Sequence, residues 1–363
     1  MSLNFMPEQD AATVKRKGEH IRICLEEPVQ GEGIRTGLES LRFRHNALPD
    51  ISFNDISLRT EFLGKALHAP LLVSSMTGGT NQALEINRRL AETAQHRGWA
   101  MGLGSMRAAI ERDTLAATFR VRDVAPDIPI IANLGAVQLN CGYGADECRR
   151  AVELAEADAL VLHLNGMQEV FQPEGDTDFK GLLSRIELVC RTLNIPVGVK
   201  EVGWGIDGET AVKLATAGVA FIDVAGAGGT SWSQVEKYRT TDPIRKLAAE
   251  TFAGWGIPTA RSIKEVRAQA PGMTVIASGG LKSGLDAAKA IALGADMAGY
   301  GRILLSGAAA GGNVAEEADS PALLAQFERI EFELRAAMFG IGADSVADLK
   351  QTDRLIKSDL LYE

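Results

Sequence analysis

One stretch decides the fold: residues 275–302 read VIASGGLKSGLDAAKAIALGADMAGYGR. A continuous apolar run at 275–279 ends in two glycines, an amphipathic segment follows at 284–293, and a second apolar run occupies 297–301. Continuous apolar runs are typical of parallel strands that are buried on both faces, and the amphipathic segment has the period of a covering helix. The stretch therefore predicts a strand, a helix and a second strand parallel to the first.

The same unit recurs along the chain. Six further apolar runs are expected to form strands, at residues 71–75, 100–105, 129–134, 160–165, 197–202 and 221–225. Helices are expected between them at 82–97, 145–157, 181–193 and 208–217. Eight such units favour a closed (β/α)8 TIM barrel of the α/β class over an open doubly wound sheet.

The segments outside these units are expected to belong to the same single domain, because no low-complexity linker divides residues 1–363. A leader at 1–67, with a hairpin at 51–67, is expected to contribute to the active site and to cover the barrel floor. The long link after the sixth strand is expected to hold a helix at 242–252, and long links of this kind commonly carry function. The tail at 316–363 is expected to cover the outside of the barrel with helices at 321–338 and 345–357.

The composition is that of a globular, acidic protein. Of 363 residues, 46% are hydrophobic and 23% charged, and the formal net charge is −9. Binding to a nucleic-acid backbone needs a basic face, so this charge argues against nucleic acid as the main partner. Residues 1–20 lack the apolar core of a signal peptide and no apolar run reaches about 18 residues, so a cytoplasmic protein without membrane contact is expected. The four cysteines show neither CxxC pairing nor zinc-like spacing and are expected to be free thiols.

Glycines and polar side chains follow nearly every predicted strand. Because active sites of barrels lie at the carboxyl ends of the strands, these residues are expected to share one mouth. Gly279-Gly280 precede a helix that starts near Ser283, and bare N–H groups at a helix start suit a phosphate. Gly301-Arg302 and Gly228-Gly229-Thr230 offer two more such turns. The glycines could serve only to make tight turns, but three such loops on adjacent strands favour a phosphate site.

Lys200 ends the fifth apolar run, in otherwise apolar surroundings. The charge of a buried lysine must be matched by other groups, so packing alone does not explain this residue. Two functions compete: a nucleophile that forms a Schiff base, or a fixed cation beside an electron-rich ring.

A second set of residues suits a substrate that carries phosphate. Arg16-Lys17 with His20, Arg107, and His163 with Asn165 supply the cations and donors that phosphate oxygens require. Glu169 adds a carboxylate able to hold Mg²⁺ against phosphate. Each has an ordinary alternative: a solvated basic tail for Arg16-Lys17, a hydrogen-bonded core histidine for His163, and a solvated loop for Gln168 and Glu169.

In their order along the chain, these motifs resemble those of the type 2 isopentenyl diphosphate isomerases, a family of FMN-dependent barrels. The resemblance runs from Arg16 to about Arg302. It rests on RKxxH at 16–20, SMTGG at 75–79, GSxR at 104–107, NLG at 133–135, HLNxxQE at 163–169, VKEVG at 199–203, GGTSW at 228–232 with Glu236, WGIPT at 255–259 and SGG at 278–280.

The resemblance implies a role for each site residue. FMN would be held by Ser75, Met76, Thr77, Ser105, Asn133, Lys200, Thr230, Gly280, Leu281, Lys282, Gly301 and Arg302. The substrate would contact Arg16, Lys17, His20, Ser105, Met106, Arg107, His163, Asn165 and Gln168. The catalytic residues would be Gln168, Lys200, Trp232 and Glu236, and Glu169 would bind Mg²⁺. Four sites depart from the family pattern: Met106 replaces Gln, Lys282 replaces Arg, Ala225 replaces Ser, and Gly301-Arg302-Ile303 replaces an Ala-x-Pro-like turn.

The activity that the resemblance implies is the interconversion of isopentenyl diphosphate and dimethylallyl diphosphate, by proton addition and abstraction through reduced flavin. NADPH, or another reductant, would keep the flavin reduced, and Mg²⁺ would bind the diphosphate. The assembly implied is a homotetramer or homo-octamer.

Four other functions fit a barrel of this kind. An FMN-dependent 2-hydroxy-acid oxidase, the main alternative, needs a histidine base near the sixth or seventh strand end, and none of the five histidines lies there. A nucleotide dehydrogenase of the inosine monophosphate type needs a cysteine after the sixth strand, but the last cysteine is Cys190. A Schiff-base aldolase that uses Lys200 would be colourless, and a catalytically dead phosphometabolite-binding barrel would show no turnover.

Overall fold

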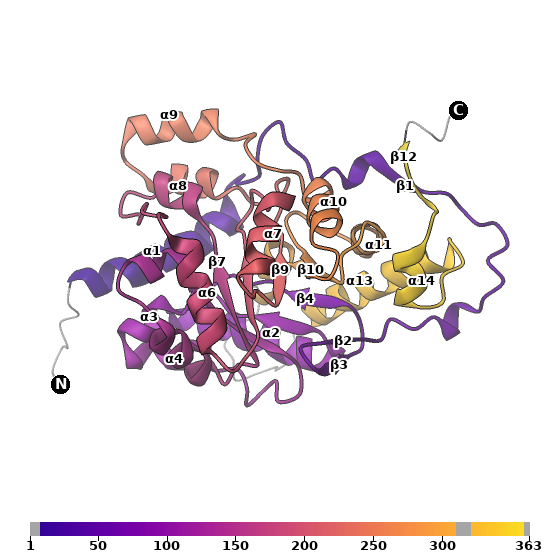
Figure 1. The fold of residues 1–363 in the computed structure, drawn as a ribbon, viewed down its shortest axis with the longest axis horizontal. Helices are drawn as coiled ribbons and strands as arrows, with labels where there is room; N and C mark the ends of the chain where they lie inside the picture. The colour runs from indigo at the N-terminus through magenta and orange to yellow at the C-terminus, as the bar shows by residue number, and fades with distance from the viewer. Residues whose placement is uncertain (1–7, 310–320, 359–363) are drawn as a thin grey trace.

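The computed structural model of the protein describes residues 8–309 and 321–358 (Figure 1). Eight parallel strands form a closed barrel in the order β4 to β11, because β11 pairs back onto β4. The strands are β4 (Leu71–Val73), β5 (Ala100–Gly102), β6 (Ile130–Gly135), β7 (Ala159–His163), β8 (Val197–Lys200), β9 (Phe221–Asp223), β10 (Thr274–Ala277) and β11 (Met297–Tyr300). This confirms the predicted TIM barrel: each strand begins within one residue of its predicted start and ends within three residues of its predicted end.

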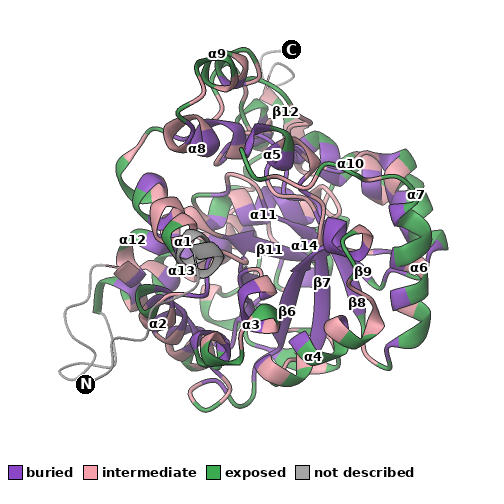
Figure 2. Cartoon of the chain, turned by 90° about the vertical axis from the view of Figure 1, so that its left-hand side faces the viewer, coloured by how far each residue is buried: buried purple, intermediate pink, exposed green. Residues whose placement is uncertain are grey.

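A ring of helices covers the barrel, as the amphipathic segments predict. These helices are α2 (Asn81–Arg97), α4 (Ala145–Ala155), α6 (Leu182–Thr192), α7 (Gly208–Thr216), α10 (Thr259–Gln269), α11 (Gly284–Ala292) and α12 (Arg302–Ala309). Figure 2 shows their inner faces buried against the strands and their outer faces exposed. In α2, Thr80 caps the first turn by accepting a hydrogen bond from the N–H of Ala83, and Gly98 ends the helix in a left-handed conformation. α10, in the long link after β9, and α12, after β11, were not expected from the sequence.

Shorter helices stand at the carboxyl ends of the strands. They are α3 (Arg107–Glu111), α5 (Gly166–Phe171), α8 (Trp232–Arg239) and α9 (Pro243–Thr251), with 3-10 turns at Asp113–Phe119 and Ala136–Asn140. α9 confirms the helix expected at 242–252. α8 and α9 extend the loop after β9 away from the barrel (Figure 1).

A hairpin closes the amino-terminal end of the barrel. β2 (Thr60–Phe62) pairs antiparallel with β3 (Lys65–Leu67) through the two-residue turn Leu63-Gly64, in which both residues have positive φ. Phe62 and Leu67 join the apolar cluster inside the floor of the barrel, and the ring of Phe62 lies 5.7 Å from that of Phe221. The hairpin therefore fills the end opposite to the strand tips.

The leader and the tail differ from expectation. Residues 8–26 form a helix, α1 (Glu8–Glu26), where no helix was expected. In the tail, α13 (Pro321–Phe339) confirms one expected helix, but only α14 (Val346–Gln351) lies in the second. β12 (Leu355–Lys357) is a strand that pairs antiparallel with β1 (Leu41–Phe43), so the helix expected up to residue 357 is wrong there. Residues 1–7, 316–320 and 359–363 of these predicted segments lie outside the described part of the chain. In that part, no helix combines the length and apolar character needed to cross a membrane.

Candidate functional site

A cavity of about 570 Å³ opens at the carboxyl ends of the strands. It brings together 21 of the predicted site residues, which come from all eight strand ends and from α1. The predicted residues in its wall are Arg16, Lys17, His20, Ser75, Met76, Thr77, Ser105, Arg107, Asn133, His163, Asn165, Gln168, Glu169, Lys200, Thr230, Trp232, Gly280, Leu281, Lys282, Gly301 and Arg302.

Two predicted residues do not line this cavity. The side chain of Met106 is fully buried in the hydrophobic core. Its backbone N–H donates to the carbonyl of Asn133 at 2.8 Å, which holds this part of the loop against β6. The prediction that Met106 contacts substrate is therefore not supported. Glu236 is also fully buried, but it lies directly behind cavity residues and bonds to them.

Lys200 lies at the end of β8 and is only 7% exposed. Its Nζ lies 3.7 Å from the carboxylate of Asp223 on β9 and donates to the carbonyl of Glu201 at 2.5 Å. Asp223 in turn accepts from the hydroxyl of Ser278 at 2.6 Å. The structure thus places a compensated, buried cation at the cavity wall, held through residues of three neighbouring strands.

His163, next to Lys200 in the barrel, is neutral at ordinary pH. Burial, together with the positive charges of Lys200 and Lys17, lowers its pKa to about 3. Its Nδ1 lies 2.7 Å from Oδ1 of Asn133. Because a carbonyl oxygen only accepts, Nδ1 carries the hydrogen in this arrangement and Nε2 is left as an acceptor.

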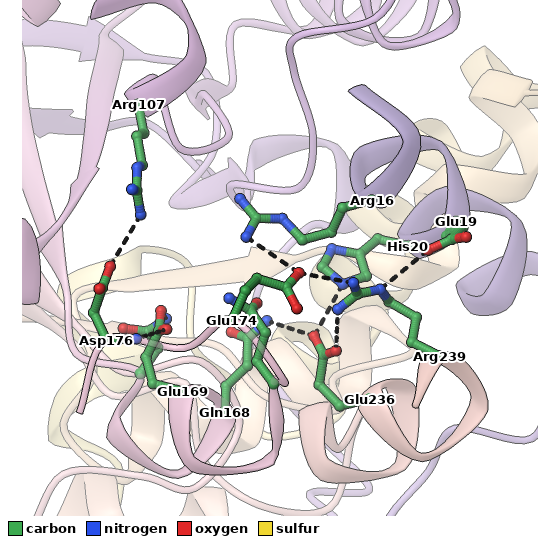
Figure 3. A network of polar contacts seen from close by, with 12 residues as sticks. Arg16, Glu19, His20, Arg107, Gln168, Glu169, Glu174, Asp176, Glu236 and Arg239 are labelled. Carbon is green, nitrogen blue, oxygen red and sulfur yellow. Dashed lines mark hydrogen bonds and ion pairs between the residues drawn. The ribbon is translucent and has the colours of Figure 1, made fainter. Parts of the chain in front are cut away.

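A polar network joins α1 to α8 across the mouth (Figure 3). Oε1 of Glu236 contacts Nε2 of His20 at 2.9 Å and accepts from the side-chain amide of Gln168 at 3.3 Å, while Oε2 accepts from Arg239 at 2.5 Å. Burial alone would raise the pKa of Glu236, but the hydrogen bond from His20 and the charge of Arg239 outweigh it and leave the pKa below its usual value. Trp232 packs edge-on to His20, with ring centroids 5.1 Å apart. One end of the cavity therefore has an indole in its wall and a buried carboxylate directly behind that wall.

The glycine loops after β9 and β10 pack backbone against backbone. A Cβ on Gly229 would lie 2.5 Å from the amide nitrogen of Gly280, and one on Gly279, where φ is 101°, would lie 2.1 Å from the carbonyl of Gly226. These glycines are therefore needed for close approach, whatever they bind. The two readings of the glycines, tight packing and ligand binding, are compatible here.

The start of α11 is not the bare anion site expected from the sequence. The N–H of Gly284 donates to the carboxylate of Glu333 at 2.7 Å, and the N–H of Asp286 to the hydroxyl of Ser283 at 3.1 Å. These N–H groups of the helix itself are already bonded, whereas Gly280 and Leu281 in the loop before it line the cavity, so a phosphate site in that loop stays a prediction. The first residues of α12, Arg302 and Ile303, line the cavity as well, and the first N–H groups of any helix have no partner within it.

Glu169 and Asn165 form a second polar pair in the wall. Oε1 of Glu169 accepts from the amide of Asn165 at 2.6 Å and Oε2 from the backbone N–H of Asp176 at 2.8 Å. Oδ1 of Asn165 is buried and has no hydrogen-bond partner among the residues that the structure describes, and burial raises the pKa of Glu169. Among the described residues no three His, Cys, Asp or Glu side chains gather as a metal site, so a cation here would need further oxygen ligands from a substrate.

Sequence reasoning missed several residues that shape the site. Gln138 lines the cavity, and Glu201 accepts three backbone hydrogen bonds that hold the loop after β8. Burial raises the pKa of Glu201 to about 7 in spite of these bonds. Arg239 was missed as well. Only Glu201 stood in a recognised motif; Gln138 and Arg239 lie in loops and helices beyond the strand ends.

Comparison with known proteins places this geometry in a family. Residues 109–356 match the family described as FMN-dependent dehydrogenase. The isopentenyl-diphosphate delta-isomerase of Oceanobacillus iheyensis is 52% identical over 94% of this chain and 95% of its own length. The isopentenyl-diphosphate delta-isomerase of Nostoc is 52% identical over 95% and 96%, and that of Rickettsia akari 45% identical over 96% and 99%.

Solved structures agree on the fold alone. A lactate oxidase of Pediococcus acidilactici superposes with a TM-score of 0.66 at 18% identity, over 96% of this chain and 93% of that one. A mandelate oxidase superposes with a TM-score of 0.61 at 20% identity, over 89% and 90%. On the sequence matches, the chain belongs to the FMN-dependent dehydrogenase family and, within it, to the type 2 isopentenyl-diphosphate delta-isomerases.

Proposed function

We propose that this protein is an FMN-dependent isomerase that interconverts isopentenyl diphosphate and dimethylallyl diphosphate. The observation that carries the proposal is the cavity of about 570 Å³ at the strand ends, whose wall contains the buried cation of Lys200 and the cations of Arg16 and Lys17 on α1. Relatives that carry the isomerase name are about half identical over nearly the whole chain.

The residues around Lys200 fit FMN. Ser74 Oγ is buried in the cavity wall and has no hydrogen-bond partner within the described part of the chain, as expected of a group that contacts a ligand. The glycine loops and the start of α12 would hold the flavin phosphate, and Lys200 would hold its positive charge beside the ring. The residues that would contact FMN are Ser75, Met76, Thr77, Ser105, Asn133, Lys200, Thr230, Gly280, Leu281, Lys282, Gly301 and Arg302. When bound and reduced, the flavin supplies an electron-rich face and a group that can exchange a proton.

The diphosphate would bind beneath α1. Arg16, Lys17 and Arg107 supply positive charge, and Ser105, His20 and Asn165 supply hydrogen-bonding groups. Neutral His163 would accept a hydrogen from a protonated phosphate oxygen or take up a proton with the substrate. Mg²⁺ would be held by Glu169 and by phosphate oxygens, with the unpartnered Oδ1 of Asn165 close by.

The far end of the cavity would contain the reacting carbons. Moving the double bond builds positive charge on the branched carbon, and the deprotonated Glu236 and the face of Trp232 stabilise such charge where water is excluded. Gln168, which donates to Glu236, would hold that carboxylate toward the hydrocarbon. A proton shared between His20 and Glu236 is also within reach of this end.

Three finer properties belong to the same proposal. NADPH would serve as the reductant that keeps the flavin competent without being consumed stoichiometrically. The enzyme would act in the cytoplasm, and it would assemble as a homotetramer or homo-octamer. The reductant, the cellular location and the assembly are proposed from the family resemblance and not from contacts within this chain.

The oxidase alternative has less support. The oxidases share the fold at about 20% identity, which carries no activity across. The chain has no histidine in the loops after β9 and β10, where that chemistry needs its base.

The test is an anaerobic assay of the purified, FMN-loaded protein with isopentenyl diphosphate, Mg²⁺ and NADPH. Dimethylallyl diphosphate should accumulate to a constant ratio without net NADPH loss. The proposal would be overturned by a colourless protein that does not bind added FMN, or by flavin reduction with 2-hydroxy acids in place of isomerisation.

A further inference from the structure

A short turn behind the cavity carries two carboxylates that hold its cations. This acidic turn (Glu174, Gly175 and Asp176) follows α5. Oδ2 of Asp176 accepts from Nη1 of Arg107 at 3.0 Å and from the side-chain amide of Gln138, also at 3.0 Å. Arg107 and Gln138 both line the cavity, whereas Asp176 does not. Asp176 therefore holds the side chains of two cavity-lining residues from outside the cavity.

The same turn reaches the opposite wall through Glu174. Its Oε1 lies 3.6 Å from Nη1 of Arg16 on α1 and accepts from Arg239 on α8 at 2.8 Å. Figure 3 shows Arg16 and Arg107 approaching the turn from two sides, each ending on one of its carboxylates. One turn therefore connects cationic groups of α1, α3 and α8.

The turn is held in place against Glu169. The backbone N–H of Asp176 donates to Oε2 of Glu169 at 2.8 Å, and the N–H of Gly175 donates to the carbonyl of Gln172 at 3.1 Å. A Cβ on Gly175 would lie 1.9 Å from the carbonyl oxygen of Glu169, so no side chain fits there. The turn is therefore a defined part of the site and not a freely moving loop tip.

The cations need such anchors because they are crowded together. Burial lowers the pKa of Lys17 to about 8, and the charges of Arg16 and Arg107 act in the same direction. Free arginines under this repulsion would turn toward solvent. A guanidinium has five N–H donors, so one anchored by a carboxylate still presents donors to a ligand in a fixed direction.

We propose that Asp176, supported by Glu174 in the acidic turn, is a positioning residue for diphosphate binding: it orients Arg107 and Gln138 toward the cavity from behind. The inference rests on the proposed function and specifies which side chains make the diphosphate site competent. Asp176 itself touches neither substrate nor cofactor.

The test measures binding of inorganic pyrophosphate with Mg²⁺ to the FMN-loaded protein by calorimetry. Asp176→Ala should weaken binding about tenfold, as expected when an anchor of charge-assisted hydrogen bonds is lost. Asp176→Asn, which keeps one acceptor oxygen, should weaken it less. Asp178→Ala is the matched control, because Asp178 is exposed on the same loop and its carboxylate accepts only from the N–H of Lys180 among the contacts described.

A double-variant comparison separates positioning from a general structural effect. In an Arg107→Ala background, Asp176→Ala should weaken pyrophosphate binding less than threefold, and flavin affinity should stay unchanged throughout. Equal losses in both backgrounds, an equal loss in Asp178→Ala, or tighter binding in Asp176→Ala would overturn the inference. Turnover distinguishes the two proposals: active wild-type enzyme with an unaffected Asp176→Ala variant refutes only the positioning role, whereas inactive wild-type enzyme refutes only the isomerase.

Discussion

Replacing Lys200 by methionine tests the centre of the proposed site. The substitution removes the ammonium group and keeps most of the length of the side chain. Lys289→Met is the matched control, since Lys289 is also a buried lysine, 4% exposed, whose Nζ donates to the carbonyl of Leu38 at 2.9 Å on the outer wall. We expect the two variants to lose similar stability and to differ in activity.

The expected loss of stability follows from what each lysine leaves behind. Breaking a buried ion pair commonly costs about 3–5 kcal/mol. Asp223 retains bonds from the hydroxyl of Ser278 at 2.6 Å and the N–H of Ala225 at 3.2 Å, so Lys200→Met should cost about 3 kcal/mol or less. Lys289→Met leaves one carbonyl unpaired, which costs about 1–3 kcal/mol.

The two variants are expected to differ much more in activity than in stability. A fixed charge that stabilises charge in a dry site contributes about 10²–10³-fold to turnover. Lys200→Met should therefore lower kcat by about that factor and weaken flavin binding, while Lys289→Met leaves both near the wild-type values.

The assay combines anaerobic turnover, flavin titration and urea unfolding on both variants. Full activity in Lys200→Met would refute the reasoning, because it would show that no charge is needed there. An equal loss of turnover in Lys289→Met would refute it as well, since the effect would then come from destabilisation.

Three further predictions follow from the site. Burial lowers the pKa of Lys17 to about 8, and Lys17 would bind the diphosphate only when protonated, so kcat/KM should fall as pH rises through about 8. Lys17→Arg should keep its kcat/KM at pH 9, and a wild-type profile that stays flat to pH 10 would contradict this role. Gly229→Ala should weaken flavin binding at least about tenfold in a fluorescence titration, because its Cβ would lie 2.5 Å from the backbone of Gly280. The control Gly272→Ala, whose Cβ would have no described atom within 4 Å, should bind flavin with wild-type affinity, and equal affinities of the two variants would contradict the close-approach argument. Glu169→Gln should raise the Mg²⁺ concentration for half-maximal activity about tenfold, and an unchanged Mg²⁺ titration would remove Glu169 from the metal site.

The barrel could be predicted because each strand carries its own signal. Residues 197–199 and 275–277 are apolar or glycine, and polar residues or glycines follow them, which is the pattern of a strand buried on both faces. Closure then brings every strand end to one mouth, so residues as distant as Lys200 and Gly280 could be placed together without any knowledge of contacts.

What could not be predicted depends on distant partners. The apolar residues of α1 gather at its end, Ile21 and Ile23, and both are buried by segments that lie far along the chain. Arg302 of α12 contributes to this docking by donating to the carbonyl of Cys24. The helix therefore shows no amphipathic pattern of the kind that a local reading detects.

The site shows the same limit on a smaller scale. Met106 lies between Ser105 and Arg107, which both reach the cavity, yet its own side chain points into the core. Asp176 lies well beyond a strand end and acquires its role only through Arg107 and Gln138, which belong to other loops. A position in a strand tip identifies the neighbourhood of a residue but not the direction of its side chain.

The pairing of β1 with β12 has a consequence for how the protein is made. The residues of β1 precede every barrel strand in the chain and those of β12 follow every one, so translation makes β12 after the whole barrel. Across residues 8–309 and 321–358 the eight barrel strands pair only with one another, so the barrel can close before β12 is made. The pairing of β1 with β12 can therefore form only after all eight barrel strands have been made.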